Sequence, residues 1–220
     1  MVQVSRRTGF TGSALIRLLA RLTDIEVPEP RQAFADRLSQ WLGWTDAISL
    51  SAALNGNPAI ASSSRARGSG TAEERESTRV RTTLANAIAD DTRNAPVDAT
   101  ADFAAHRRRY LARQQAMETS IGPLRGRLRS TLASRSPDMA KLAAVDVVME
   151  QVLSAQEHRL LATVPAMLEK HFERLRQTGT EAEPSAWLNV FRKDMHDVLL
   201  AEMEIRFQPV EGLLEALRTR

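Results

Sequence analysis

The chain has 220 residues, of which 43% are hydrophobic and 26% charged, the composition of a globular protein with a sizeable core. The absence of cysteine excludes disulfides, thiolate metal sites and a cysteine nucleophile. No apolar run reaches the roughly 20 residues needed to cross a bilayer, and the N-terminus lacks the apolar segment of a secretion signal. We therefore expect no transmembrane segment and a cytoplasmic location.

Charge is unevenly distributed along the chain. The whole chain carries 30 Lys and Arg against 27 Asp and Glu, a formal net charge of +3. Residues 1–136 hold 20 basic and 13 acidic groups, whereas residues 137–220 hold 10 basic and 14 acidic groups. The two parts are therefore electrostatically complementary.

Three helices are predicted in the first quarter of the chain. Thr11 is positioned to cap the first and Thr45 the third, because a threonine hydroxyl accepts a hydrogen bond from the first turn of a helix. The apolar spacing places these helices at residues 12–22, 31–42 and 46–54.

A segment rich in Ser, Gly and other small residues follows these helices. Such a composition is typical of a flexible linker. The predicted domain organisation is a small three-helix unit at 1–54, a flexible linker at 55–70 and an elongated helical bundle at 71–220.

Two helices open the predicted bundle. Thr71 begins the first, with Glu74 completing a capping-box pattern, and this helix is expected to run to about Asn94. The second begins at Thr100. It is expected to break or kink at Pro123, because proline lacks an N–H and disfavours helical geometry in the residue before it.

The remaining helices form the best-defined part of the predicted fold. The run Ser-Pro-Asp at 136–138 is a strong helix start. Pro165 is expected to bend the helix that follows and to free the carbonyl of Leu161. A last helix is expected from Pro184 to the C-terminus, with a bend at Pro209.

These last two helices are expected to lie antiparallel, because only a short loop joins them. The first of them carries coiled-coil-like spacing at Leu142, Val145, Met149 and Val152. The fold class predicted is all-α: an elongated bundle of long, proline-bent helices, with a C-terminal antiparallel helical hairpin and a small N-terminal helical unit.

Residues 7–22, "RTGFTGSALIRLLARL", and 32–54, "QAFADRLSQWLGWTDAISLSAAL", resemble an uncharacterised family of Arg/Ala-rich helical proteobacterial proteins. The family has no assigned activity and no defined catalytic residues, so the resemblance brings no site residues. The resemblance also implies that the genes of its members lie next to genes for motor-like or OmpA-like envelope proteins. The resemblance therefore implies a cytoplasmic accessory role beside a membrane complex.

Arginines between residues 106 and 135 are the main candidate interaction site. Three successive arginines in "HRRRYLARQ", 106–114, point in three directions on a helical wheel. Three interpretations remain open: internal ion pairs with acids of the last third, an acidic protein partner or anionic lipid, and nucleic-acid phosphates. The candidates are Arg107, Arg108, Arg109, Arg113, Arg125, Arg127 and Arg129, and the expected internal partners include Glu150, Glu157, Glu169 and Glu173.

Catalytic and metal-binding patterns are not found in the sequence. The four histidines do not supply the two Glu-x-x-His pairs of a di-iron bundle, and no phosphate-binding loop, nucleophile elbow or zinc-protease motif is present. We expect no catalytic residue, no metal, no cofactor and a protein that is not an enzyme. Trp44, in "QWLGW" at 40–44, is instead a candidate contact for a partner.

The sequence therefore favours a non-enzymatic helical scaffold or adaptor that binds other proteins, with a homodimer through the long hairpin as one form of this hypothesis. The alternative is a nucleic-acid-associated protein that uses the arginine-rich segment 106–135.

Overall fold

The computed structural model describes residues 13–24, 34–56, 69–93, 102–178 and 186–219. Within these ranges every regular element is a helix, as the sequence predicts, and no strand occurs. The helices are α1 (Ala14–Thr23), α2 (Phe34–Trp41), α3 (Trp44–Asn55), α4 (Ser69–Arg93), α5 (Phe103–Ala133), α6 (Pro137–Leu161), α7 (Val164–Thr178) and α8 (Ala186–Arg218).

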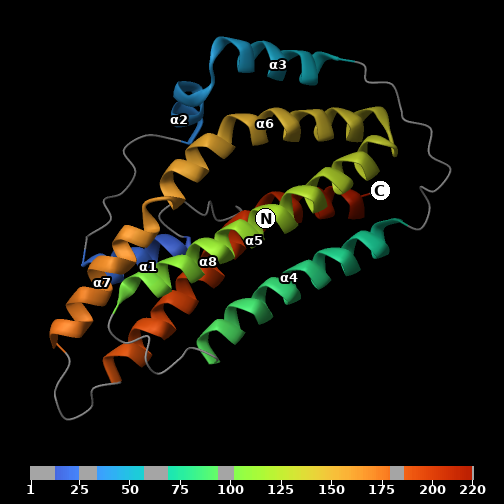
Figure 1. Cartoon of the computed structure of the whole chain (residues 1–220). Coiled ribbons are helices and arrows are strands. Elements are labelled where there is room, and N and C mark those ends of the chain that lie inside the picture. Colours follow the sequence, from blue (N-terminus) through green and yellow to red (C-terminus); the bar gives the residue numbers. More distant parts are fainter. Residues whose placement is uncertain (1–12, 25–33, 57–68, 94–101, 179–185, 220) are drawn as a thin grey trace, which may run out of the picture.

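Helices α5 and α8 form the centre of the elongated bundle (Figure 1). α4 packs against both of them, α6 and α7 against α5, and α7 also against α8. The most buried large side chains come mainly from this central pair, and leucine and methionine supply much of the core besides the aromatic rings. They include Tyr110, Met117, Leu124 and Leu128 of α5, and Phe191, Leu199 and Phe207 of α8.

Short polar side chains start several helices, as the sequence suggests, but Thr45 does not cap α3, and Thr71 does not start α4, which begins at Ser69. Ser136 caps α6, its hydroxyl accepting from the Met139 N–H at 3.2 Å. Ser13 caps α1, whereas the predicted cap Thr11 lies outside the described residues. Gly43 occupies the cap position of α3 in place of Thr45, and its N–H donates to the Asp46 carboxylate at 3.0 Å.

The three internal prolines have different effects. α5 continues through Pro123 and so does not break there, and α8 likewise continues through Pro209. Buried residues on both sides of Pro123, such as Ile121 and Leu124, hold that helix in place. Pro165 has the larger effect, because α6 ends at Leu161 and a new helix, α7, starts three residues later at Val164.

The C-terminal hairpin is formed by α7 and α8, which run antiparallel (Figure 1). α6 is not part of it, and packs instead against α5 and α3. The expected coiled-coil seam is therefore divided: Val152 is buried, but Leu142 is 41% exposed.

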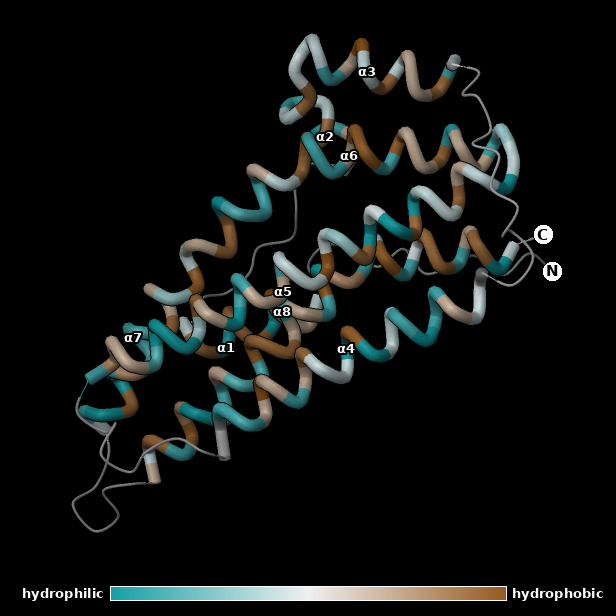
Figure 2. The backbone as a smooth tube through the Cα atoms, turned by 45° about the vertical axis from the view of Figure 1, so that its right-hand side comes forward, coloured by the Kyte–Doolittle hydropathy of each residue, from teal (hydrophilic) through white to brown (hydrophobic). Residues whose placement is uncertain are grey.

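The N-terminal helices lie on the bundle at separate places. Leu15 and Leu22 of α1 enter the common core, where α1 packs against α7 and α8. α3 packs against α6 at the other side of the molecule (Figures 1 and 2). The expected division into a three-helix unit at 1–54, a linker at 55–70 and a bundle at 71–220 stays a prediction. Most of the expected linker, residues 57–68, lies outside the described residues.

A buried histidine joins α1 to the hairpin. His171 donates from Nε2 to Asp194 at 2.8 Å, and Arg174 donates both to His171 Nδ1 at 3.0 Å and to the carbonyl of Leu22 at 2.8 Å. Because a guanidinium group only donates, Nδ1 accepts from Arg174, which leaves Nε2 to donate to Asp194. This network fixes the C-terminal end of α1 on α7.

Candidate interaction sites

Two of the predicted arginines pair with acids of the last third, as expected. Arg125 of α5 makes a two-bond contact with Asp146 of α6, at 2.8 Å from Nε and 2.7 Å from Nη2. Arg129 lies 2.6 Å from Glu150 and 3.5 Å from Asp146. Because both guanidinium groups are largely buried, these four charges form an internal clamp between α5 and α6.

Two other candidates find their counter-charges on α4 and not in the last third. Arg113 binds both carboxylate oxygens of Asp91, at 2.5 and 2.8 Å. Arg127 lies 3.1 Å from Glu76. The charge pattern of the sequence does not point to α4 as a source of counter-charge, since the acids of α4 lie in the part of the chain with a net positive charge.

Of the four expected acidic partners, only Glu150 pairs with a candidate arginine. Glu157 pairs with Arg206 of α8 at 3.2 Å, and Glu173 with Arg176 of its own helix at 3.5 Å. Glu169 is exposed beside a pocket that Arg107 also lines.

Arg107, Arg108 and Arg109 make no side-chain hydrogen bond or ion pair with the residues that the structure describes. Arg107 and Arg108 are exposed, and Arg109 is half-buried. The pKa of Arg192 lies below its ordinary value, because burial and the nearby charge of Arg109 both disfavour its protonated form. The three successive arginines are thus a cationic part of the surface.

Trp44 is the most exposed large apolar side chain in the described ranges, at 82%. Ile48 and Leu54, on the same helix, are 53% and 55% exposed. α3 has no buried residue and a single charged one, Asp46. Trp41, by contrast, is half-buried. The candidate contact at Trp44 therefore belongs to an apolar face of α3, which we define by Trp44, Ile48 and Leu54.

A buried polar cluster, which the sequence analysis missed, lies where α5, α8 and the α6–α7 junction meet. The Glu202 side chain is completely buried. It accepts from Tyr110 Oη at 2.5 Å, from Gln114 Nε2 at 3.1 Å and from Arg206 Nε at 3.0 Å. Burial, followed by the negative charge of Glu202, raises the pKa of Tyr110, so its hydroxyl remains protonated and donates.

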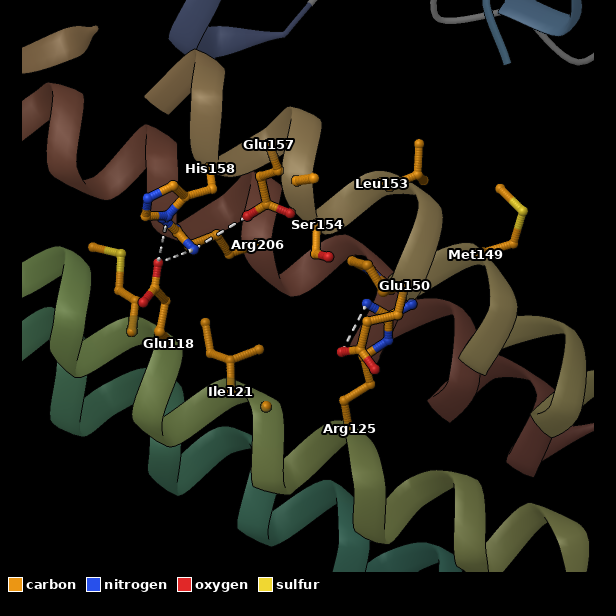
Figure 3. Close-up of a pocket in the computed structure, with 14 residues that line it drawn as sticks. Glu118, Ile121, Arg125, Met149, Glu150, Leu153, Ser154, Glu157, His158 and Arg206 are labelled. Carbon is orange, nitrogen blue, oxygen red and sulfur yellow. Dashed lines mark ion pairs between the residues drawn. The ribbon is translucent and has the colours of Figure 1, made fainter. Parts of the chain in front are cut away.

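A pocket of about 620 Å³ opens beside this cluster, between α5, α6 and α8 (Figure 3). Glu118, Glu157, His158 and Arg206 gather at one end of it, and Glu150 with Arg125 at the other (Figure 3). A second pocket of about 420 Å³ also adjoins Glu118, His158 and Arg206. Spacing in the sequence does not reveal this arrangement, because it depends on the packing of three separate helices.

The described residues contain no group of three or more His, Asp or Glu side chains with the geometry to hold a metal ion. No helix among them is both long enough and apolar enough to span a bilayer.

Fold and surface together define an all-α protein, a helical bundle with one exposed apolar helix and a charged pocket between its central helices. The chain belongs to the family described as "Protein of unknown function (DUF3348)", whose model matches residues 1–219. The match extends far beyond the two N-terminal segments that carry the resemblance in the sequence. Neither a curated protein nor a solved structure matches the chain.

Proposed function

We propose that this protein is a non-enzymatic scaffold or adaptor that binds another protein through the apolar face of α3. The single observation that carries the proposal is the exposure of Trp44, Ile48 and Leu54 together on one helix. Tryptophan is enriched among the residues that dominate protein interfaces, since its large ring gains most from leaving water.

The position of α3 supports the same function. The helix lies at the periphery, packed against α6 on one side (Figures 1 and 2). A helix with a solvated outer face normally carries charged residues there, whereas α3 has only Asp46. An apolar helix that is accessible from one side suits a partner that presents a hydrophobic groove or helix of its own.

The test compares captures from the native host with three forms of the full chain: wild type, Trp44→Ala with Ile48→Ser, and Val190→Ala. Val190 is the matched control, because it is 48% exposed but lies on α8. We expect the α3 double variant alone to lose the proteins that wild type retains. Equal capture by all three forms would refute the proposal.

Self-association is tested separately, by light scattering on the same three proteins. If the partner is a second copy, wild type and the Val190→Ala control are dimers and the α3 variant is a monomer. A cytoplasmic place beside a membrane complex, which the family resemblance implies, completes the proposal and is tested by identifying the captured proteins.

A nucleic-acid-associated function is the second candidate, and the cationic surface at Arg107, Arg108 and Arg109 supports it. Nucleic-acid binding that neutralises several phosphates weakens steeply with salt. A mobility shift at about 50 mM salt, a permissive condition, that disappears when the three arginines are replaced by glutamine would favour it. If the wild-type protein gives no mobility shift at this salt concentration, the nucleic-acid-associated function is excluded.

A further inference from the structure

One end of the 620 Å³ pocket carries more negative than positive charge. Arg206 is the only guanidinium group among the described residues that pairs with Glu118, Glu157 or Glu202. Its N–H groups bind Glu202 and reach Glu157 at 3.2 Å, but Glu118 lies 3.7 Å away, beyond hydrogen-bond distance. His158 is also 3.7 Å from Glu118 and is mostly exposed. Glu118 and Glu157 line this end of the pocket, and both share the Arg206 guanidinium with the buried Glu202.

The electrostatic environment of Glu157 reflects this imbalance. Burial raises the pKa of Glu157 above its ordinary value, and the charges of Glu202 and Glu118 add to the effect, although Arg206 and Arg125 oppose it. The ionised carboxylate is therefore short of compensation, and an additional cation beside it would supply what is lacking.

The opposite end of the pocket is balanced. Arg125 and Arg129 together face Asp146 and Glu150, so two cations meet two anions there. Glu150 and Glu157 are seven residues apart on α6, which separates the two ends by about 10 Å along the helix. A cationic ligand is thus attracted to one end only, the end at Glu118 and Glu157.

Apolar side chains line the wall between the two ends (Figure 3). Leu153 and Met149 come from α6, and Ile121 comes from α5 and is drawn between the two charged groups in Figure 3. Met117 and Pro209 complete the wall. Such a surface favours methylene groups over water, and a volume of about 620 Å³ lies in the ordinary range for small-molecule pockets.

We propose that this pocket binds an alkylammonium group, whose charged nitrogen lies beside Glu118 and Glu157, next to the Arg206 guanidinium that they share, and whose methylene chain lies along Ile121, Met117 and Pro209. An ammonium has three donors and suits two carboxylates that still have free acceptor positions. The ligand is either a free aliphatic amine or a lysine side chain of another protein, since both present the same chemistry. This site is separate from the apolar face of α3 and does not depend on the proposed function.

Isothermal titration calorimetry of the full chain tests the site with four probes. They are 1-aminopentane, ammonium chloride, 1-pentanol and Nα-acetyl-lysine methylamide. We expect 1-aminopentane and the lysine derivative to bind, and ammonium chloride and 1-pentanol to bind at least about tenfold more weakly, because each lacks one of the two recognised groups. Tighter binding of the lysine derivative identifies a protein side chain as the source, and tighter binding of 1-aminopentane identifies a free amine.

Substitutions of the two carboxylates test whether 1-aminopentane binds in the pocket. Glu118→Gln and Glu157→Gln should each weaken 1-aminopentane by about tenfold, the effect of losing a charge-assisted hydrogen bond. Glu215→Gln is the matched control, because Glu215 is an exposed glutamate of α8 that pairs with Arg218. Circular dichroism verifies that each variant is folded. No binding of 1-aminopentane to wild type at about millimolar concentration, or equal binding to wild type and both pocket variants, would overturn the proposal.

Discussion

The side-chain amide of Gln114 lies 3.3 Å from the carbonyl oxygen of Leu161 and 3.1 Å from both carboxylate oxygens of Glu202. Pro165 has no N–H, so the carbonyl four residues before it has no helical partner. A glutamine from a neighbouring helix thus occupies the position that the proline leaves open, and it connects the α6–α7 junction to the buried glutamate of α8.

Replacing this glutamine should destabilise the fold. Gln114→Leu removes the donor from two buried acceptors, and an unsatisfied buried acceptor costs about 1–3 kcal/mol. We expect a loss of about 2 kcal/mol in the free energy of unfolding, measured by urea denaturation. Gln115→Leu is the control, because the side chain of Gln115 is exposed, and it should change stability by less than about 0.5 kcal/mol. Equal effects of the two substitutions would contradict the described network.

The two arginines Arg125 and Arg127 should differ strongly in their contribution to stability. The side chain of Arg125 is 13% exposed and that of Arg127 51% exposed. Arg125→Ala leaves Asp146 without its closest partner in a half-buried site, at an expected cost of about 3 kcal/mol. Arg127→Ala breaks an exposed pair and should cost about 0–1 kcal/mol. Thermal or chemical unfolding of both variants measures the difference, and an equal cost would show that the α5–α6 clamp contributes little.

Glu157→Gln should make the protein more stable at neutral pH. The pKa of Glu157 is higher in the folded chain than in the unfolded chain, chiefly because of burial. The unfolded chain therefore releases this proton at lower pH, and stability decreases as the pH rises from the ordinary carboxyl value through the higher folded pKa. Glutamine does not ionise, so this part of the decrease should be missing.

The measurement for Glu157 is the melting temperature of wild type and variant across a pH series. The two curves should converge at low pH, where both side chains are neutral, and the variant should melt higher near pH 7. A variant that melts lower than wild type at pH 7 would show that the bond to Arg206 outweighs the effect of burial.

Asp24 is the single residue other than glycine with a positive φ in the described ranges, at 54°. It ends α1 in the left-handed conformation, with its N–H donating to the Ala20 carbonyl. Asp24→Gly should raise the free energy of unfolding by about 0.5–1 kcal/mol, because glycine adopts this conformation without steric cost. Asp24→Ala retains a Cβ and should not stabilise. A stability gain from alanine equal to that from glycine would contradict this account.

Local signals in the sequence predict where helices begin and end better than they predict which helices pack together. Ser136 and Pro137 define the start of α6, and Pro165 predicts both the interruption and the free Leu161 carbonyl. Capping and proline effects depend on residues within one turn, so they are visible in the sequence. Pro123 shows the limit of such signals, since burial of neighbouring residues keeps α5 continuous.

Contacts between distant segments are only partly predictable. Charge complementarity anticipates that Arg129 meets Glu150, because both belong to parts of opposite net charge. It does not anticipate that Arg113 binds Asp91, nor that Glu202 is completely buried, because both follow from which helices pack together. Exposure of Trp44 likewise depends on where α3 lies relative to α6.

The central claim, that the apolar face of α3 binds a protein, is tested most directly by photo-crosslinking in the native host. A photoreactive phenylalanine analogue is placed at Trp44 in one strain and at Val190 in another, and both sites are exposed. The account predicts a discrete crosslinked protein from position 44 that is missing from position 190. No crosslink from position 44, or the same products from both positions, would contradict it.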